Sequence, residues 1–102
     1  MKIDEIDGTI YCRFEESVNA NVCSDVAHVL AEQIESALAR TPGIKVVFDM
    51  NGTRYISSAF LRLCVLYHKK VGKENFRCEN VSDDVQSVFL STGLDGILVE
   101  KR

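Results

Sequence analysis

The order of apolar and polar residues along the chain predicts short strands and helices that alternate. Two strand-like runs, Lys2–Ile6 and Thr9–Glu15, stand on either side of Asp7-Gly8. An Asp-Gly pair is typical of a tight turn between antiparallel strands, so the two runs predict a hairpin. In the second run, alternation predicts one buried face made of Ile10, Cys12 and Phe14.

Helical spacing of apolar residues follows the hairpin. It predicts a helix from about Val22 to Arg40, with Asn21 as its N-cap and Pro42-Gly43 behind its end. The apolar stripe of this helix consists of Val22, Val26, Val29, Leu30, Ile34, Ala37 and Leu38. A stripe at this spacing predicts a helix that packs one face against a core.

A continuous apolar run at Ile44–Met50 predicts a central strand that is covered on both faces. After a short link, Ser57 or Ser58 can cap a second helix that runs to about Val71 and ends at Gly72. This helix is apolar almost all round, so we expect it to be deeply packed.

The last part of the chain predicts a third internal strand at Phe76–Asn80 and a short helix that is capped by Ser82 and ends near Gly93. A final strand is predicted at Ile97–Glu100. The resulting order, β-β-α-β-α-β-α-β, predicts an α/β fold with a mixed central sheet, in a single domain over residues 1–102.

Composition narrows the class of function. The 102 residues include 12 basic and 15 acidic ones, for a formal net charge of −3. A weakly acidic chain without a basic run is a poor ligand for nucleic-acid backbones, so we expect no nucleic-acid partner. The first residues show no apolar signal core, and no apolar stretch is long enough to span a bilayer. We therefore expect a cytoplasmic protein without direct membrane insertion.

The cysteines and histidines are scattered. No CxxC pair occurs among the four cysteines, which are Cys12, Cys23, Cys64 and Cys78. In a chain without a signal peptide this spacing predicts buried, reduced thiols. His28 and His68 lack the spaced partners that metal ligation requires, so we expect no metal site.

Motifs for catalysis or nucleotide binding are absent from the sequence. It contains no dinucleotide fingerprint, no Walker loop, no nucleophile elbow and no HExxH motif. This predicts a protein that is not an enzyme and needs no cofactor. Asp49 stands at the end of an apolar strand, where α/β folds often place functional groups, although a plain polar strand end would read the same way.

Two hydroxyl groups, on Ser57 and Ser58, stand where the loop after the apolar strand opens into the second helix. Either residue can simply cap the helix. Alternatively one of them is a phosphoacceptor, because the free N–H groups at a helix start tolerate a phosphate. The added charge of about −1.5 to −2 would break docking with a partner and leave the fold intact.

Three segments resemble STAS domains, especially stand-alone bacterial anti-sigma factor antagonists. The segment VVFDMNGTRYISSAFLRLCVLYHKKVG is similar to the family's centre, where a buried strand and a turn lead to D-S-[ST]-G-L at a helix start. The family's C-terminal part resembles NVSDDVQSVFLSTGLDGILVE, and the approach to its first helix resembles ESVNANVCSDVAHVLAEQI. The resemblance covers about residues 8 to 100 and implies a STAS-like fold with helices mainly on one face of the sheet.

The resemblance places Ser58 on the family's phosphorylatable serine, with Ser57 as a second, weaker candidate. Ser57 stands where the family has an acid, Ala59 where it has Ser or Thr, and Phe60 where it has glycine. Phe60 would therefore add bulk where a partner approaches.

Other positions align with family landmarks. Asp49 falls on the strand-end Asp, Leu61 on the leucine, Asn19 on the Asp of the L-D segment and Glu16 on its glycine. The partner-binding surface that the resemblance implies consists of Asn19, Ser57, Ser58, Ala59, Phe60 and Arg62.

The function that the resemblance implies is anti-sigma factor antagonism, a non-catalytic step in signal transduction to transcription. The unphosphorylated protein would bind an anti-sigma factor that carries a histidine-kinase-like ATPase domain and acts as a serine kinase. Phosphorylation at Ser58 would end this binding, and a Ser/Thr phosphatase would restore it.

Two alternatives stay open. In the first, the chain would be a STAS subunit of a transporter-associated or signalling complex. It would bind its protein partner constitutively, without phosphorylation. In the second it would be an enzyme for a small molecule, using Asp49 or a cysteine thiol.

Overall fold

The computed structural model describes residues 1–14 and 19–94, without the side chains of residues 20 and 21. The fold begins with the predicted hairpin. Strands β1 (Lys2–Ile6) and β2 (Thr9–Arg13) pair in antiparallel fashion, with Ile6 opposite Thr9. The two residues of the turn, Asp7 (φ 50°) and Gly8 (φ 78°), both adopt the left-handed conformation that a type I′ turn requires.

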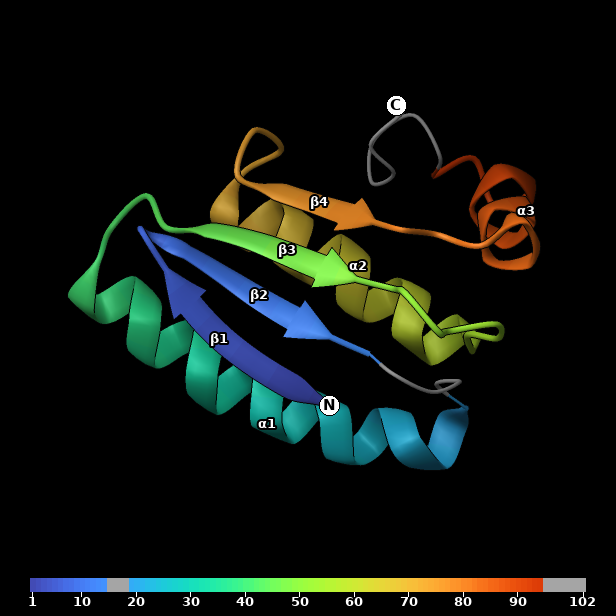
Figure 1. The fold of residues 1–102 in the computed structure, drawn as a ribbon, viewed down its shortest axis with the longest axis horizontal. Helices are drawn as coiled ribbons and strands as arrows, with labels where there is room; N and C mark the ends of the chain where they lie inside the picture. Colours follow the sequence, from blue (N-terminus) through green and yellow to red (C-terminus); the bar gives the residue numbers. More distant parts are fainter. Residues whose placement is uncertain (15–18, 95–102) are drawn as a thin grey trace.

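Two parallel strands extend the sheet. Strand β3 (Lys45–Asp49) pairs with β2, and β4 (Phe76–Glu79) pairs with β3, so the strand order is β1-β2-β3-β4 (Figure 1). This mixed sheet confirms the predicted α/β class. The predicted strand at Ile97–Glu100 lies outside the described residues.

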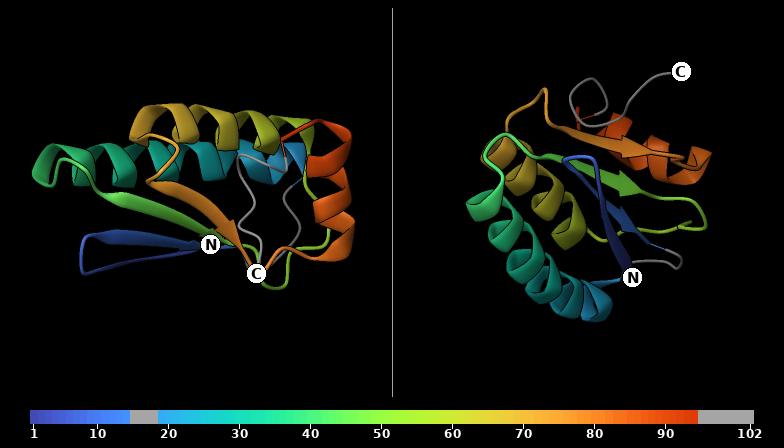
Figure 2. Two further views of the ribbon diagram at one scale, coloured as in Figure 1. Left: turned by 90° about the horizontal axis from the view of Figure 1, so that it is seen from above. Right: turned by 60° about the vertical axis from the view of Figure 1, so that its left-hand side comes forward.

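In the part of the chain that the structure describes, three helices alternate with these strands. Helix α1 (Ala20–Arg40) connects β2 to β3, α2 (Ser58–Val71) connects β3 to β4, and α3 (Asp83–Ser91) follows β4. Helices α1 and α2 lie side by side on one face of the sheet and run in the same direction, while α3 lies beyond the end of β4 (Figures 1 and 2). The prediction of helices mainly on one face is confirmed.

Aromatic rings fill the space between the sheet and the two helices. Phe48 on β3 is at the centre, with ring centroids 5.1 Å from Phe14, 5.0 Å from Phe76 and 5.9 Å from Phe60. The predicted inward face of β2 is confirmed, because Ile10, Cys12 and Phe14 are each at most 2% exposed. Phe48 meets Phe14 and Phe76 edge to face, an arrangement that adds packing energy beyond the area that the rings bury.

The start of α1 differs from the prediction. Asn19, rather than Asn21, is the N-cap, and its side-chain oxygen accepts a hydrogen bond of 3.0 Å from the backbone N–H of Val22. Both asparagines are good caps by residue type, and the helix begins at the first of them. The end of α3 is as predicted, because Gly93 N–H and Leu94 N–H bond back to the carbonyl oxygens of the helix in a Schellman motif.

The packing of α2 is less deep than predicted. One side of the helix is buried, through Phe60, Leu61, Cys64 and Tyr67. The opposite side faces outward, and the Leu66 side chain is 51% exposed there. The helix is apolar on more faces than the sheet can cover, so part of its apolar surface lies outside the core.

Strand β3 is buried on both sides, as predicted. Val46 and Phe48 face the helices and are fully buried. Val47 points to the opposite face, lies outside the main core cluster and is only 2% exposed. The strand register places Val47 between Tyr11 on β2 and Arg77 on β4, so cross-strand neighbours contribute to its burial.

Candidate functional site

The candidate site lies at the end of the sheet where the parallel strands stop and the next helices start. Arg13, Asp49 and Glu79 are the last residues of β2, β3 and β4, and the register aligns them across the sheet. In α/β proteins this carboxyl-terminal edge is the usual place for a functional site, because loops from neighbouring strands converge there.

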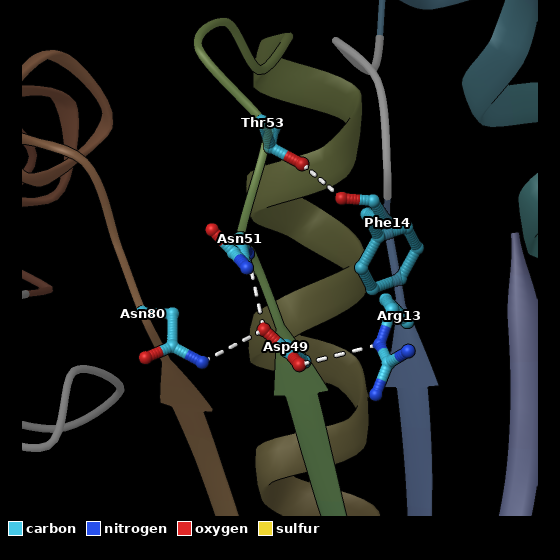
Figure 3. Close-up of polar contacts among 6 residues, drawn as sticks. All are labelled: Arg13, Phe14, Asp49, Asn51, Thr53 and Asn80. Atoms are coloured by element: carbon cyan, nitrogen blue, oxygen red, sulfur yellow. Dashed lines mark hydrogen bonds and ion pairs between the residues drawn. The ribbon is translucent and has the colours of Figure 1, made fainter.

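Asp49 is held by polar groups from three directions (Figure 3). Its Oδ1 accepts hydrogen bonds of 3.0 Å from the Asn51 backbone N–H and 3.0 Å from the Asn80 side-chain amide. Its Oδ2 lies 3.5 Å from Nε of Arg13. Partial burial raises the pKa of Asp49, but the hydrogen bonds and the Arg13 charge outweigh this and hold the pKa below its ordinary value.

These contacts favour a structural role for Asp49. Both carboxylate oxygens are engaged, and the side chain is only 17% exposed. The carboxylate joins the ends of β2 and β3 to the residue that follows β4. We therefore interpret Asp49 as a polar residue at a strand end that orders the following turn. This geometry gives no support to a role as a catalytic acid.

Thr53 makes a second link at the same edge. Its hydroxyl donates a hydrogen bond of 2.7 Å to the carbonyl oxygen of Phe14, and its own carbonyl oxygen accepts one of 3.3 Å from the Ser82 hydroxyl (Figure 3 shows the first). Thr53 is 1% exposed. The loop between β3 and α2 is thereby tied both to the end of β2 and to the start of α3.

Sequence reasoning missed Thr53, Asn80 and Arg13. The partners of Thr53 and Asn80 are 39 and 31 residues away, so no local pattern reveals them. Asn80 did carry a signal, since asparagine after a strand often adopts the left-handed conformation that it has here (φ 56°).

The two neighbouring serines at the start of α2 have different environments. Ser57 is the N-cap, is 8% exposed, and accepts a hydrogen bond of 3.3 Å from the Phe60 backbone N–H through its Oγ. Ser58 is the first helical residue and is exposed. The capping role falls to Ser57, which leaves the Ser58 hydroxyl accessible from solvent.

Cys23 connects the start of α1 to this site. The side chains of Cys23 and Ser57 share a hydrogen bond, and Arg62 lies close enough for its charge to act on the thiol. Burial raises the pKa of Cys23 more than these two groups lower it. The first turns of α1 and α2 therefore lie next to one another at the same end of the molecule (Figures 1 and 2).

The remaining predicted partner-binding residues differ in their exposure to solvent. Asn19 and Arg62 are exposed, and Ala59 is half-buried. Phe60 is fully buried, and its ring centroid lies 5.1 Å from that of Phe14. The expectation that Phe60 adds bulk where a partner approaches is wrong, because its ring points into the core. Glu16 lies outside the described residues.

Apolar side chains are exposed on α2 and in the loop before it. Tyr55, in the loop before α2, is 56% exposed, and Leu66 is 51% exposed. Ser58, Arg62 and Leu66 follow each other at intervals of four residues, which places them along one side of the helix. We call Tyr55, Ser58, Arg62 and Leu66 the α2 surface.

The cysteines offer no reactive thiol. All four are free and buried, as predicted. Burial raises the pKa of Cys12 to about 12 and raises that of Cys64 well above its ordinary value. Thiols that are buried and protonated are poor nucleophiles, which argues against the thiol-dependent enzyme.

Within residues 1–14 and 19–94, no group of three or more His, Cys, Asp or Glu side chains is placed to hold a metal ion. In the same ranges, no helix combines the length and apolar character that a membrane span needs.

Comparison with known proteins identifies the fold. No protein-family model matches the chain, and no curated protein sequence matches it. A solved structure of the anti-sigma factor antagonist SpoIIAA, in its unphosphorylated form, matches with a TM-score of 0.74 over 99% of this chain and 88% of that chain. The sequence identity is 13%, so the likeness is one of fold. The STAS-like fold expected from the sequence is confirmed.

Proposed function

Since the chain has the fold of an anti-sigma factor antagonist, we propose that it is a non-catalytic regulatory domain of this kind, comprising residues 1–102 and acting in the cytoplasm. Its partner is an anti-sigma factor with a histidine-kinase-like ATPase domain. Binding uses the α2 surface together with Asn19, and phosphorylation of Ser58 ends it. A Ser/Thr phosphatase reverses the modification.

One observation carries the proposal: the exposed Ser58 hydroxyl is separate from the cap of α2. Because Ser57 caps the helix, Ser58 can be modified without removing the capping hydrogen bond. A phosphoryl group on the first helical residue lies at the positive end of the helix dipole, so we expect the fold to tolerate it. The same group would place about two negative charges where the partner docks.

The test is a titration of the protein against the candidate anti-sigma factor. Ser58→Asp should weaken binding by about 2–5 kcal/mol, or roughly 30-fold or more, because it puts an uncompensated charge into the interface. Ser58→Ala should bind like the parent protein. Ser36→Asp is the matched control, because Ser36 is an exposed serine near the other end of α1 and adds the same charge.

Modification is measured separately. With ATP and the kinase-like partner, the intact mass of the protein should rise by one phosphoryl group. Ser58→Ala should abolish this increase, and Ser36→Ala should preserve it. Phosphorylation that persists in Ser58→Ala would show that the acceptor is another residue.

The exposed apolar side chains favour a second candidate function, constitutive binding as a STAS subunit of a larger complex. Tyr55 and Leu66 give the α2 surface apolar contacts that need no phosphate switch. In that case Tyr55→Ala would weaken binding to the partner, and incubation with ATP and the partner would add no phosphoryl group to Ser58.

A further inference from the structure

The outward face of the two-helix layer is divided by charge. Helix α1 exposes three acids on the side away from the sheet, namely Asp25, Glu32 and Glu35. Helix α2 contains no acidic residue and exposes Arg62, Lys69 and Lys70. Since the helices lie side by side (Figure 2), an acidic strip runs along a basic strip.

Three of these six charges are paired within one molecule. Glu35 and Lys70 form an ion pair between the helices, and Glu32 pairs with His28 on its own helix at 3.5 Å. In the described part of the chain, Asp25, Arg62 and Lys69 take part in no ion pair. Charges of both signs therefore remain available to a partner.

An apolar side chain lies within the basic strip. Leu66 is 51% exposed on the outward side of α2, one turn from Arg62 and close to Lys69 in the helix. Its exposure gives the charged face a small apolar centre, the usual arrangement of a protein interface with a polar rim.

We propose that this face binds a second copy of the same chain. An acidic strip beside a basic strip is self-complementary, since a two-fold rotation can place α1 of each copy on α2 of the other. The axis must lie in the interface and run parallel to the helices. An axis across the helices would place α1 on α1 and α2 on α2, so that like charges would meet.

Because α1 and α2 run in the same direction, α1 of one copy can face α2 of the other along the whole length of α2. The contacts between Cys23 and Ser57 and between Glu35 and Lys70 show that equivalent levels of the two helices are about 34 residues apart. At the level of Arg62, the facing α1 presents His28, with Asp25 and Glu32 about one turn to either side. At the level of Lys69, it presents Glu32 and Glu35. Leu66 lies at the level of Glu32 of the facing α1, near the centre of the interface.

The dimer is weak and sensitive to salt. Helix α2 is about 21 Å long, and two helices side by side are about 20 Å wide. Such a footprint is smaller than a standard stable interface, so we expect dimers at about 0.1–1 mM protein in low salt. The dimer would cover Arg62 and Leu66, so it would compete with any partner that binds the α2 surface.

The experiment measures mass in solution by sedimentation equilibrium, using the protein alone. At low salt the apparent mass should rise from monomer toward dimer with concentration, and about 0.5 M NaCl should reverse this rise. A charge-swapped pair of variants gives the sharpest test. Arg62→Glu with Lys69→Glu makes α2 acidic, and Asp25→Lys with Glu32→Lys makes α1 basic.

Each variant alone should be monomeric, because both of its strips then have the same sign. An equimolar mixture of the two should dimerise again, since every strip then meets its opposite. Leu66→Asp should abolish the dimer, whereas Leu90→Asp, at an equally exposed leucine on α3, should not. Circular dichroism establishes that each variant is folded. Parent protein that stays monomeric at 1 mM in low salt, or a mixture that stays monomeric, overturns the proposal.

These readouts are independent of any anti-sigma factor. Failure of the proposed function leaves the self-association result unchanged, and the reverse also holds.

Discussion

The hydroxyl group of Thr53 donates a hydrogen bond of 2.7 Å to the carbonyl oxygen of Phe14, and this bond joins two segments that are 39 residues apart. Both partners are buried. The bond fixes the loop before α2 against the end of β2, and so sets the position of Ser57 and Ser58. The position of the α2 surface thus depends on a buried side chain that is not part of that surface.

Replacing Thr53 by Val should lower the free energy of unfolding by about 1–3 kcal/mol, because the Phe14 carbonyl oxygen loses a partner in a buried place. Thr53→Ser keeps the hydroxyl and should lose clearly less. Urea denaturation of the three proteins measures the difference. A larger loss for Ser than for Val would mean that the methyl group of Thr53, rather than its hydroxyl, is what matters.

The carboxylate of Asp49 should make stability depend on pH. Its pKa in the folded protein is below the ordinary value of 3.8, so its contribution is fully present above about pH 4 and disappears as the pH falls through the lowered pKa. Asp49→Asn removes the titrating group. Thermal melts of both proteins should differ most at neutral pH and converge in acid. A difference that does not change between about pH 2.5 and pH 7 would contradict the ion pair and hydrogen bonds assigned to Asp49.

The two serines at the start of α2 should differ in their effect on stability. Ser57→Ala removes the capping oxygen and should cost about 1 kcal/mol. Ser58→Ala should change stability by less than about 0.5 kcal/mol, because Ser58 is exposed and makes no cap. Denaturant midpoints of the two variants compare them directly. The reverse order would place the cap on Ser58.

Two apolar residues on opposite sides of α2 should respond very differently to truncation. Phe60→Ala opens a cavity between Phe14 and Phe48 and should cost about 3–5 kcal/mol. Leu66→Ala should cost less than about 1 kcal/mol, since Leu66 is already half in solvent. Phe60→Leu provides a milder change should the alanine variant not fold. A large loss at Leu66 would show that α2 is buried on its outward side.

All four thiols should react only after unfolding. They are free and buried, and burial raises the pKa values of Cys12, Cys23 and Cys64. A chromogenic thiol reagent should label the native protein slowly and should count four thiols in unreduced protein in denaturant. A count of two or none would reveal disulfides.

Local sequence patterns predicted the elements well where the deciding interactions are local. Asp7-Gly8, Gly72 and Gly93 mark turns and helix ends through backbone preferences that a single residue sets. The choice between Asn19 and Asn21 as the N-cap of α1 was harder to predict, because both residue types are good caps. The backbone conformation decides which of the two caps the helix.

Long-range contacts were beyond such patterns. A helix that is apolar on most faces does not reveal which face meets the sheet, so the burial of Phe60 and the exposure of Leu66 could not be distinguished. Thr53 and Asn80 reach partners across the sheet edge, and only the folded chain brings them together.

The topology also has a consequence for the order of folding. The pairing of β1 with β2 spans a two-residue turn, whereas each parallel pairing needs a helix to form and dock between its strands. Bringing together strands that are joined by such a long connection costs conformational entropy before the stabilising contacts between them can form. We therefore expect the β1–β2 hairpin to form early in folding. The pairing of β3 with β4 should follow only after α2 has formed and docked. A change in the Asp7-Gly8 turn should slow folding more than it speeds unfolding.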